Sequence, residues 1–160
     1  MSLFQFLASD ILLKEVKNPY IEFISINEAL KRDIKLSDFI INDTKLDRDK
    51  KSILICDKEE HLDEMEINHD MYYSSEYAKE YSSKQYFSEL KWRYTELRAK
   101  KLIDYLKEQL QISDEIEIWS IWLGEHKSAN VESININELN IADLEFLHDH
   151  ETPKCLVIKK

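Results

Sequence analysis

The chain has 160 residues, of which 43% are apolar and 11% aromatic, and it carries a formal net charge of −10. Its length fits one domain, residues 1–160, and its apolar residues are enough to build a core, so the composition excludes a disordered chain. The negative charge argues against a nucleic-acid or anionic-membrane partner, because phosphates are bound by Lys and Arg. The single glycine, Gly124, argues against phosphate-binding loops and nucleophile elbows, which need several small residues.

The first segment, residues 1–13, is apolar but does not resemble a secretory signal. It contains Asp10 and lacks both a basic start and a small-residue cleavage site. No later apolar run approaches the roughly 20 residues that are needed to span a membrane. Cys56 and Cys155 each lie in a short apolar run, which predicts buried free thiols in a reducing compartment. We therefore expect a cytoplasmic protein.

Four short runs of β-branched and aromatic residues, each flanked by polar turn residues, predict strands. They are Tyr20–Ile26, Ser52–Cys56, Ile116–Leu123 and Cys155–Ile158. The third run is apolar on both faces, so it belongs inside a sheet that is covered on both sides. Gly124 follows this strand directly, which predicts a turn at a positive φ angle.

The segment Ser74–Leu110 contains neither glycine nor proline and is rich in helix-forming residues, which predicts one long helix. At helical spacing its apolar residues form two stripes: Tyr77, Tyr81, Trp92, Ala99, Ile103, Leu106 and Leu110 in the first, and Tyr86, Phe87, Leu90, Tyr94 and Leu97 in the second. Such a helix must bury both stripes, either within its own domain or against a second copy of the chain. Tyr77, Tyr81 and Trp92 are therefore candidate partner-binding residues.

Two pairs of segments resemble each other weakly and suggest a βαβ duplication. Ile21–Glu28 resembles Val131–Glu138, and Leu36–Phe39 resembles Ile141–Leu144. Chance similarity is the alternative, because the chain is rich in Ile, Asn and Glu. The predicted fold class is α+β, with a small mixed sheet of four or five strands. One long helix, at about residues 75–110, is expected to pack on this sheet beside one or two short helices.

Histidines and carboxylates are the candidate metal ligands. The histidines are His61, His69, His126, His148 and His150. The first two lie in the acidic segment Asp57–Asp70, but their spacing fits no common zinc motif, and the segment lacks the glycine of a calcium loop. A solvated acidic loop is the alternative explanation for this segment, and polar residues that close a short helix explain His148 and His150 equally well.

The basic residues between Lys91 and Lys101 are interspersed with acids around the predicted helix, so they do not form a stripe for binding nucleic acid. We expect their charge to pair with the acidic segment Asp57–Asp70. Neither cysteine has a histidine beside it in the sequence, and no serine has a recognisable motif around it. Nucleophilic catalysis therefore has no support from the sequence.

Two hypotheses for function follow. The first is a non-catalytic interaction module without a cofactor, which associates with itself or binds a protein partner, for example as an inhibitor or immunity-type protein against a basic partner. The second is a metal-dependent hydrolase that uses the five histidines with nearby carboxylates. The second hypothesis requires at least three of these side chains to converge on one ion.

Overall fold

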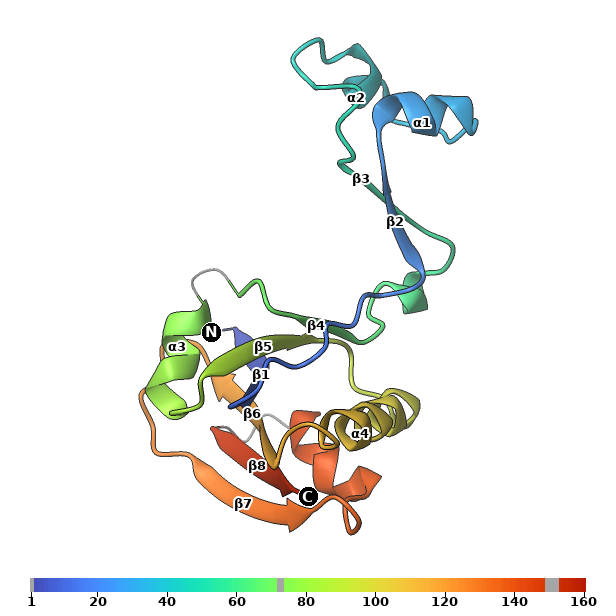
Figure 1. Cartoon of the computed structure of the whole chain (residues 1–160). Helices are drawn as coiled ribbons and strands as arrows, with labels where there is room; N and C mark the ends of the chain where they lie inside the picture. The colour runs from blue at the N-terminus through green and yellow to red at the C-terminus, as the bar shows by residue number, and fades with distance from the viewer. Residues whose placement is uncertain (1, 72–73, 149–152) are drawn as a thin grey trace. The chain divides into compact units, whose positions relative to one another are not determined.

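The computed structural model describes residues 2–71, 74–148 and 153–160 (Figure 1). The chain is α+β, as predicted, and divides into two compact units. Met1–Lys17 and Glu64–Lys160 form one unit, which we call the sheet unit, and Asn18–Asp63 form the other, which we call the ribbon unit. No helix among the described residues is both long enough and apolar enough to cross a membrane.

The sheet unit is built on a mixed sheet of six strands, in the order β4-β5-β1-β6-β8-β7. The strands are β1 (Leu3–Ser9), β4 (Glu66–Asn68), β5 (Tyr86–Lys91), β6 (Glu115–Trp122), β7 (Asn130–Asn135) and β8 (Lys154–Lys159). β7 runs parallel to β8, and the other neighbours are antiparallel. At the centre, β1 pairs with β6 so that Phe6 lies opposite Trp119.

Helices cover both faces of this sheet, because its central strands are apolar on both sides. One face, which we call the α4 face, packs against α4 (Glu96–Gln109) and the 3-10 helix η2 (Ile141–Leu147) through Leu7, Ile118 and Leu156. The other, the α3 face, packs Phe6 and Trp119 against α3 (Ser74–Tyr81). Figure 1 shows α3 and α4 on opposite sides of the sheet. The prediction that the tryptophan-containing strand is covered on both sides is confirmed.

The ribbon unit has only two strands, which pair with each other in antiparallel fashion. Its elements are β2 (Ile21–Ile24), α1 (Ile26–Lys31), α2 (Asp38–Asn42), β3 (Ile53–Cys56) and the 3-10 helix η1 (Glu59–His61). Helix α1 begins with a capping box, because the Ser25 hydroxyl accepts from the Glu28 amide while the Glu28 carboxylate accepts from the Ser25 amide. Ile24, Ile26 and Ala29 are buried and form the small interior of this unit.

The prediction of one continuous helix over about 75–110 is wrong. The segment instead forms α3, strand β5 and α4. β5 pairs with β1, with Phe87 opposite Ala8, and aromatic residues favour such a paired, half-buried position over a helix. The Thr95 hydroxyl accepts from the Arg98 amide at 3.2 Å and starts α4 as an N-cap. Three residues of the second predicted stripe, Tyr86, Phe87 and Leu90, therefore belong to strand β5 and not to a helix.

All four predicted strands are present, but two of them form the separate ribbon, and the main sheet has six strands where four or five were expected. The segments of the suggested duplication share the order strand, helix, strand. Their pairing differs, since β2 and β3 are antiparallel whereas β7 and β8 are parallel. They are therefore not copies of one βαβ unit. Gly124 has a φ of 85° and open space around its Cβ position, so its backbone angle explains its identity, as predicted.

Candidate functional site

The three aromatic residues predicted to bind a partner do not share one surface. Tyr77 and Tyr81 are half-buried on the α3 face, where the Tyr81 hydroxyl donates a 2.6 Å hydrogen bond to the Glu125 carbonyl oxygen. Trp92 follows β5 and packs on the opposite face, the α4 face, and its indole nitrogen donates to the Gln5 side-chain oxygen at 2.8 Å. The single stripe expected from a continuous helix is therefore wrong, because strand β5 separates Tyr81 from Trp92.

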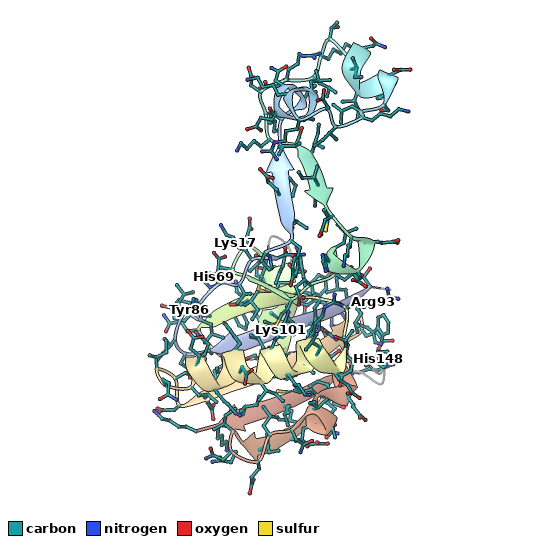
Figure 2. All side chains as sticks on the ribbon, turned by 90° about the vertical axis from the view of Figure 1, so that its right-hand side faces the viewer. Lys17, His69, Tyr86, Arg93, Lys101 and His148 are labelled. Carbon is teal, nitrogen blue, oxygen red and sulfur yellow. The ribbon has the colours of Figure 1, made fainter. Side chains whose placement is uncertain are left out.

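The structure also disperses the predicted histidines. His61 belongs to the ribbon unit, His150 lies outside the described residues, and Figure 2 shows His69 and His148 at separate places on the sheet unit. The described histidines of the sheet unit each contact a different neighbour: His69 Nε2 lies 2.6 Å from the Leu13 carbonyl oxygen, His126 Nδ1 lies 3.0 Å from a Glu80 carboxylate oxygen, and the His148 ring stacks on Tyr94 at 5.4 Å. Among the described residues, no three of these histidines approach one another closely enough to share an ion.

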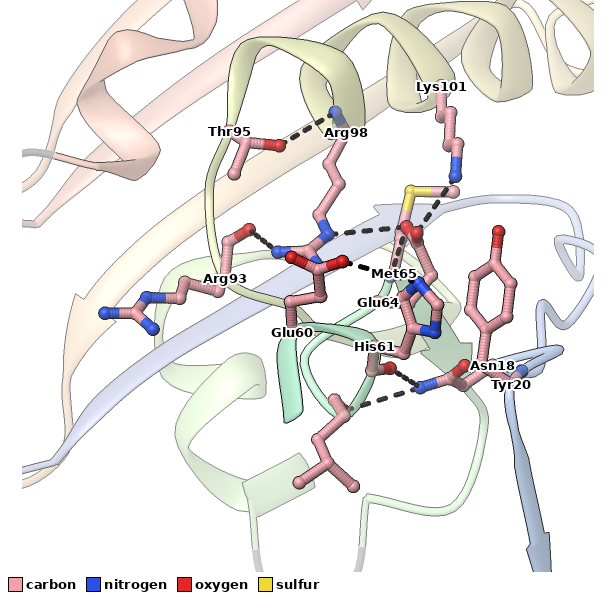
Figure 3. Close-up of polar contacts among 11 residues, drawn as sticks. Asn18, Tyr20, Glu60, His61, Glu64, Met65, Arg93, Thr95, Arg98 and Lys101 are labelled. Carbon is pink, nitrogen blue, oxygen red and sulfur yellow. Dashed lines mark hydrogen bonds and ion pairs between the residues drawn. The ribbon is translucent and has the colours of Figure 1, made fainter. Parts of the chain in front are cut away.

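The predicted pairing of the acidic segment with the basic residues of the helix holds at Glu64. This carboxylate is buried in the sheet unit and lies 2.9 Å from Lys101 Nζ and 3.5 Å from Arg98 Nε, both on α4 (Figure 3). Burial raises the pKa of Glu64, but the Met65 amide, Lys101 and Arg98 together outweigh it, so the pKa lies below its ordinary value. The cluster anchors β4 to α4 and is structural.

A cavity of about 940 Å³ lies beside η2, β7 and β8 in the sheet unit. Its basic side chain, Lys154, is 3.2 Å from Glu132 and stands over the Phe146 ring at 5.3 Å. Asp143 and Glu145 add negative charge to the lining. An anionic substrate is disfavoured here, because the cation is already paired and the remaining charges are acidic.

The ribbon unit exposes apolar side chains on one face of its two strands. Phe23 and Leu54 lie directly opposite each other on β2 and β3, and they are 50% and 43% exposed. Side chains alternate between the faces of a ribbon, so Ile21 and Cys56, which also pair, share this face. We call these four residues the apolar ribbon face. It carries no charged residue, although the whole chain has a net charge of −10.

The turn after β3 brings three different ligand groups together. The Cys56 thiol, the Asp57 carboxylate and the His61 imidazole each offer one atom, and these atoms lie within 4.8 Å of one another. His61 Nδ1 is 2.8 Å from Asp57 Oδ1, and this hydrogen bond lowers the pKa of the exposed Asp57 carboxyl. The Cys56 thiol donates to the Lys58 carbonyl oxygen at 3.2 Å. Among the described residues, this is the one group of three that could hold an ion.

Comparison with known proteins leaves the geometry as the only guide to function. No protein-family model matches the chain, and neither a curated protein nor a solved structure is significantly similar to it.

The sequence contains the residues of both features of the ribbon unit, the group of metal ligands and the apolar ribbon face, but it does not show that they come together. Cys56 lies in an apolar run, whereas Asp57 and His61 lie in the acidic segment, and their convergence depends on the short 3-10 helix η1, which ends at His61. Cys56 and His61 are five residues apart, so the sequence did not indicate that their side chains are neighbours. The exposure of Phe23 depends on how many strands its sheet has, which the run of apolar residues does not reveal.

Proposed function

We propose that this protein is a non-catalytic interaction module that associates with a second copy of itself through the apolar ribbon face. The observation that carries the proposal is the exposed Phe23–Leu54 pair on a sheet of only two strands. An isolated two-stranded ribbon is marginally stable in water, and a third strand or a covering layer stabilises it. A partner on this face would provide that layer.

Charge supports a second copy as the partner. Two chains with a net charge of −10 repel each other wherever their acidic surfaces meet, but the apolar ribbon face carries no charged side chain. A two-fold axis brings this face against itself, so that Phe23 and Leu54 of one chain meet the same pair of the other. On the opposite face of the ribbon, Glu22 is already neutralised by a bidentate pair with Arg32 at 2.8 and 2.9 Å.

The two free cysteines are consistent with a reducing compartment, and we propose a cytoplasmic location on that basis. A basic partner, as for an inhibitor or immunity-type protein, would require an acidic docking surface. The apolar ribbon face lacks one, which favours self-association over that alternative.

Light scattering coupled to size-exclusion chromatography tests the proposal over a range of protein concentrations. We expect a mass of two chains for the unaltered protein. Phe23→Lys places a charge on the two-fold axis and should weaken the dimer by at least about tenfold, which is about 1.4 kcal/mol. Leu97→Lys is the matched control, since Leu97 is 66% exposed on α4 of the sheet unit, and it should leave the dimer unchanged.

Three results would overturn the proposal. The first is a strictly monomeric protein at about 0.1 mM, a concentration at which even dimers with micromolar Kd form. The second is a Phe23→Lys dimer as stable as the unaltered one. The third is equal weakening by Leu97→Lys, which would place the contact on the sheet unit. Circular dichroism of each variant shows whether it is folded.

A further inference from the structure

The donor atoms at the end of β3 are of the kinds that zinc prefers. Thiolate sulfur and imidazole nitrogen suit Zn²⁺ and similar divalent transition-metal ions, whereas Ca²⁺ and Mg²⁺ take oxygen ligands. Cys56 provides the sulfur, His61 the nitrogen and Asp57 a carboxylate oxygen. In a tetrahedral zinc site these atoms would lie about 3.3–3.8 Å apart, given the usual bond lengths of about 2.0–2.3 Å. In the structure the three atoms lie within 4.8 Å of one another, so their side chains must rotate toward one another to reach the zinc geometry.

The local fold holds these groups before any ion binds. Cys56 is the last residue of β3 and is paired with Ile21, so its backbone is fixed by the ribbon. The chain then turns through η1, where the His61 amide donates to the Lys58 carbonyl oxygen at 3.0 Å. This turn returns the imidazole to Asp57, five residues after the cysteine.

The His61 ring is held by neighbours of the same unit. Tyr20 stacks on it with ring centroids 4.1 Å apart and planes inclined by 20°, and Asn18 Nδ2 donates to the His61 carbonyl oxygen at 2.7 Å (Figure 3). Glu60 Oε1 lies 3.8 Å from His61 Nε2, the nitrogen that does not face Asp57. When a histidine binds a metal through one nitrogen, a carboxylate near the other commonly fixes the orientation of the ring.

We infer that Cys56, Asp57 and His61 form a site for a zinc-type divalent ion. Cys56 Sγ, one Asp57 carboxylate oxygen and His61 Nδ1 are the three protein ligands, and water completes the tetrahedron. Binding replaces the thiol proton, which is released to solvent, and it replaces the hydrogen bond between Asp57 and His61 with two bonds to the metal. The bound ion ties the end of β3 to η1.

Cobalt is a suitable probe, because a thiolate–cobalt bond gives a charge-transfer absorption that reports sulfur coordination directly. Titration of the reduced, full-length protein with Co²⁺ should give this absorption at one ion per chain, and Zn²⁺ should abolish it while Mg²⁺ does not. Cys56→Ser should remove the absorption, and His61→Ala and Asp57→Asn should each weaken binding by more than about tenfold.

Two matched variants test whether the effect is specific. Cys155→Ser removes the other thiol, which is buried on β8, and His126→Ala removes an imidazole that also lies beside a carboxylate, Glu80, at 3.0 Å. Both should retain the unaltered absorption and affinity. Sulfur coordination that persists in Cys56→Ser, or is lost equally in Cys155→Ser, would overturn the assignment.

A second measurement needs no substitution and so does not depend on the folding of a variant. Zinc should slow alkylation of Cys56 in the unaltered protein, read by mass spectrometry of the peptide that contains it, and Mg²⁺ should have no effect. An alkylation rate that is the same with and without zinc would also overturn the site. Cys56 also belongs to the apolar ribbon face, so both measurements are repeated on Phe23→Lys, in which a dimer through that face is weakened, and failure of the metal site is thereby distinguished from an effect of self-association.

Discussion

The sheet unit and the ribbon unit contain similar apolar strands, but the sheet unit buries their side chains and the ribbon unit leaves some of them exposed. In the sheet unit, β1 and β6 are apolar on both faces, and helices cover both, so that Phe6 and Ile118 are fully buried. In the ribbon unit, β2 and β3 also place apolar side chains on both faces, but they have no further strand, and Phe23 is half exposed. The number of layers, and not the apolar content of a strand, decides whether a side chain is buried.

This difference separates the residues that stabilise the fold from those of the proposed self-association. The sheet unit contains both hydrophobic clusters that the described residues form, so its apolar side chains are committed to the interior. The ribbon unit holds the apolar ribbon face and the proposed metal ligands, and both are accessible from outside. Substitutions at comparable positions should therefore have unequal effects in the two units.

The largest difference in the free energy of unfolding is expected between substitutions of two phenylalanines, one in each unit. Phe6 is fully buried and stacks on Trp119 with centroids 5.9 Å apart, so Phe6→Ala should lower the free energy of unfolding of the sheet unit by about 4 kcal/mol. Phe23→Ala should change it by less than about 0.5 kcal/mol, because Phe23 belongs to the ribbon unit and is exposed.

Tryptophan fluorescence during urea unfolding measures this pair of variants. All three tryptophans, Trp92, Trp119 and Trp122, lie in the sheet unit, so the signal reports that unit alone. Equal losses for the two variants would mean that the units unfold together and that the comparison between them is mistaken.

The same contrast explains which parts of the fold the sequence revealed. The four predicted strands were recognisable because β-branched and aromatic residues are concentrated between polar turns. β1 was not predicted, because an apolar run such as that of residues 1–13 is also part of a signal-peptide pattern, yet β1 lies inside the sheet between β5 and β6. β5 was missed because the segment lacks glycine and proline, and its pairing with β1 outweighs helical propensity. Thr95, an N-cap residue before Glu96, was the available signal for a break.

The candidate sites were less predictable, since they depend on contacts between separate segments. The pairing of Glu64 with Lys101 was anticipated from opposite charges in two regions. The grouping of Cys56 with His61 depends on the path of a short turn, and the exposure of Leu54 depends on the absence of a third strand from its two-stranded sheet. Composition determines neither of these properties.

A second comparison concerns two ion pairs. Glu64→Gln removes the buried carboxylate that Lys101 and the largely buried Arg98 both contact, so the sheet unit should lose about 2 kcal/mol at neutral pH. Glu22→Gln removes the partner of Arg32 in the ribbon unit, where both side chains are about half exposed and solvent screens the pair, so its effect should be much smaller.

The pH dependence of the Glu64 variant is a further check. Because the pKa of Glu64 is lower in the folded state than the ordinary value of about 4.3, its contribution is fully present above that value and is lost as the pH falls through the folded pKa. The stability gap between the unaltered protein and Glu64→Gln should be constant above about pH 5.5 and should narrow in acid. A gap that does not change down to pH 2, below the range of most folded carboxyl pKa values, would show that Glu64 acts through packing and not through charge.

The smallest expected effect compares two helix caps of the same kind, one in each unit. Ser25 starts α1 of the ribbon unit, and Asn140 starts η2 of the sheet unit, each in a reciprocal pair with an acid three residues later. Loss of such a cap costs about 1 kcal/mol. If the units are energetically separate, Asn140→Ala should shift the tryptophan unfolding curve, whereas Ser25→Ala should leave that curve unchanged and should accelerate hydrogen exchange only within residues 18–63. A shift of the tryptophan curve by Ser25→Ala would instead indicate that the ribbon unit stabilises the sheet unit. The apolar ribbon face would then lie on a part of the molecule that contributes to folding as well as to the proposed self-association.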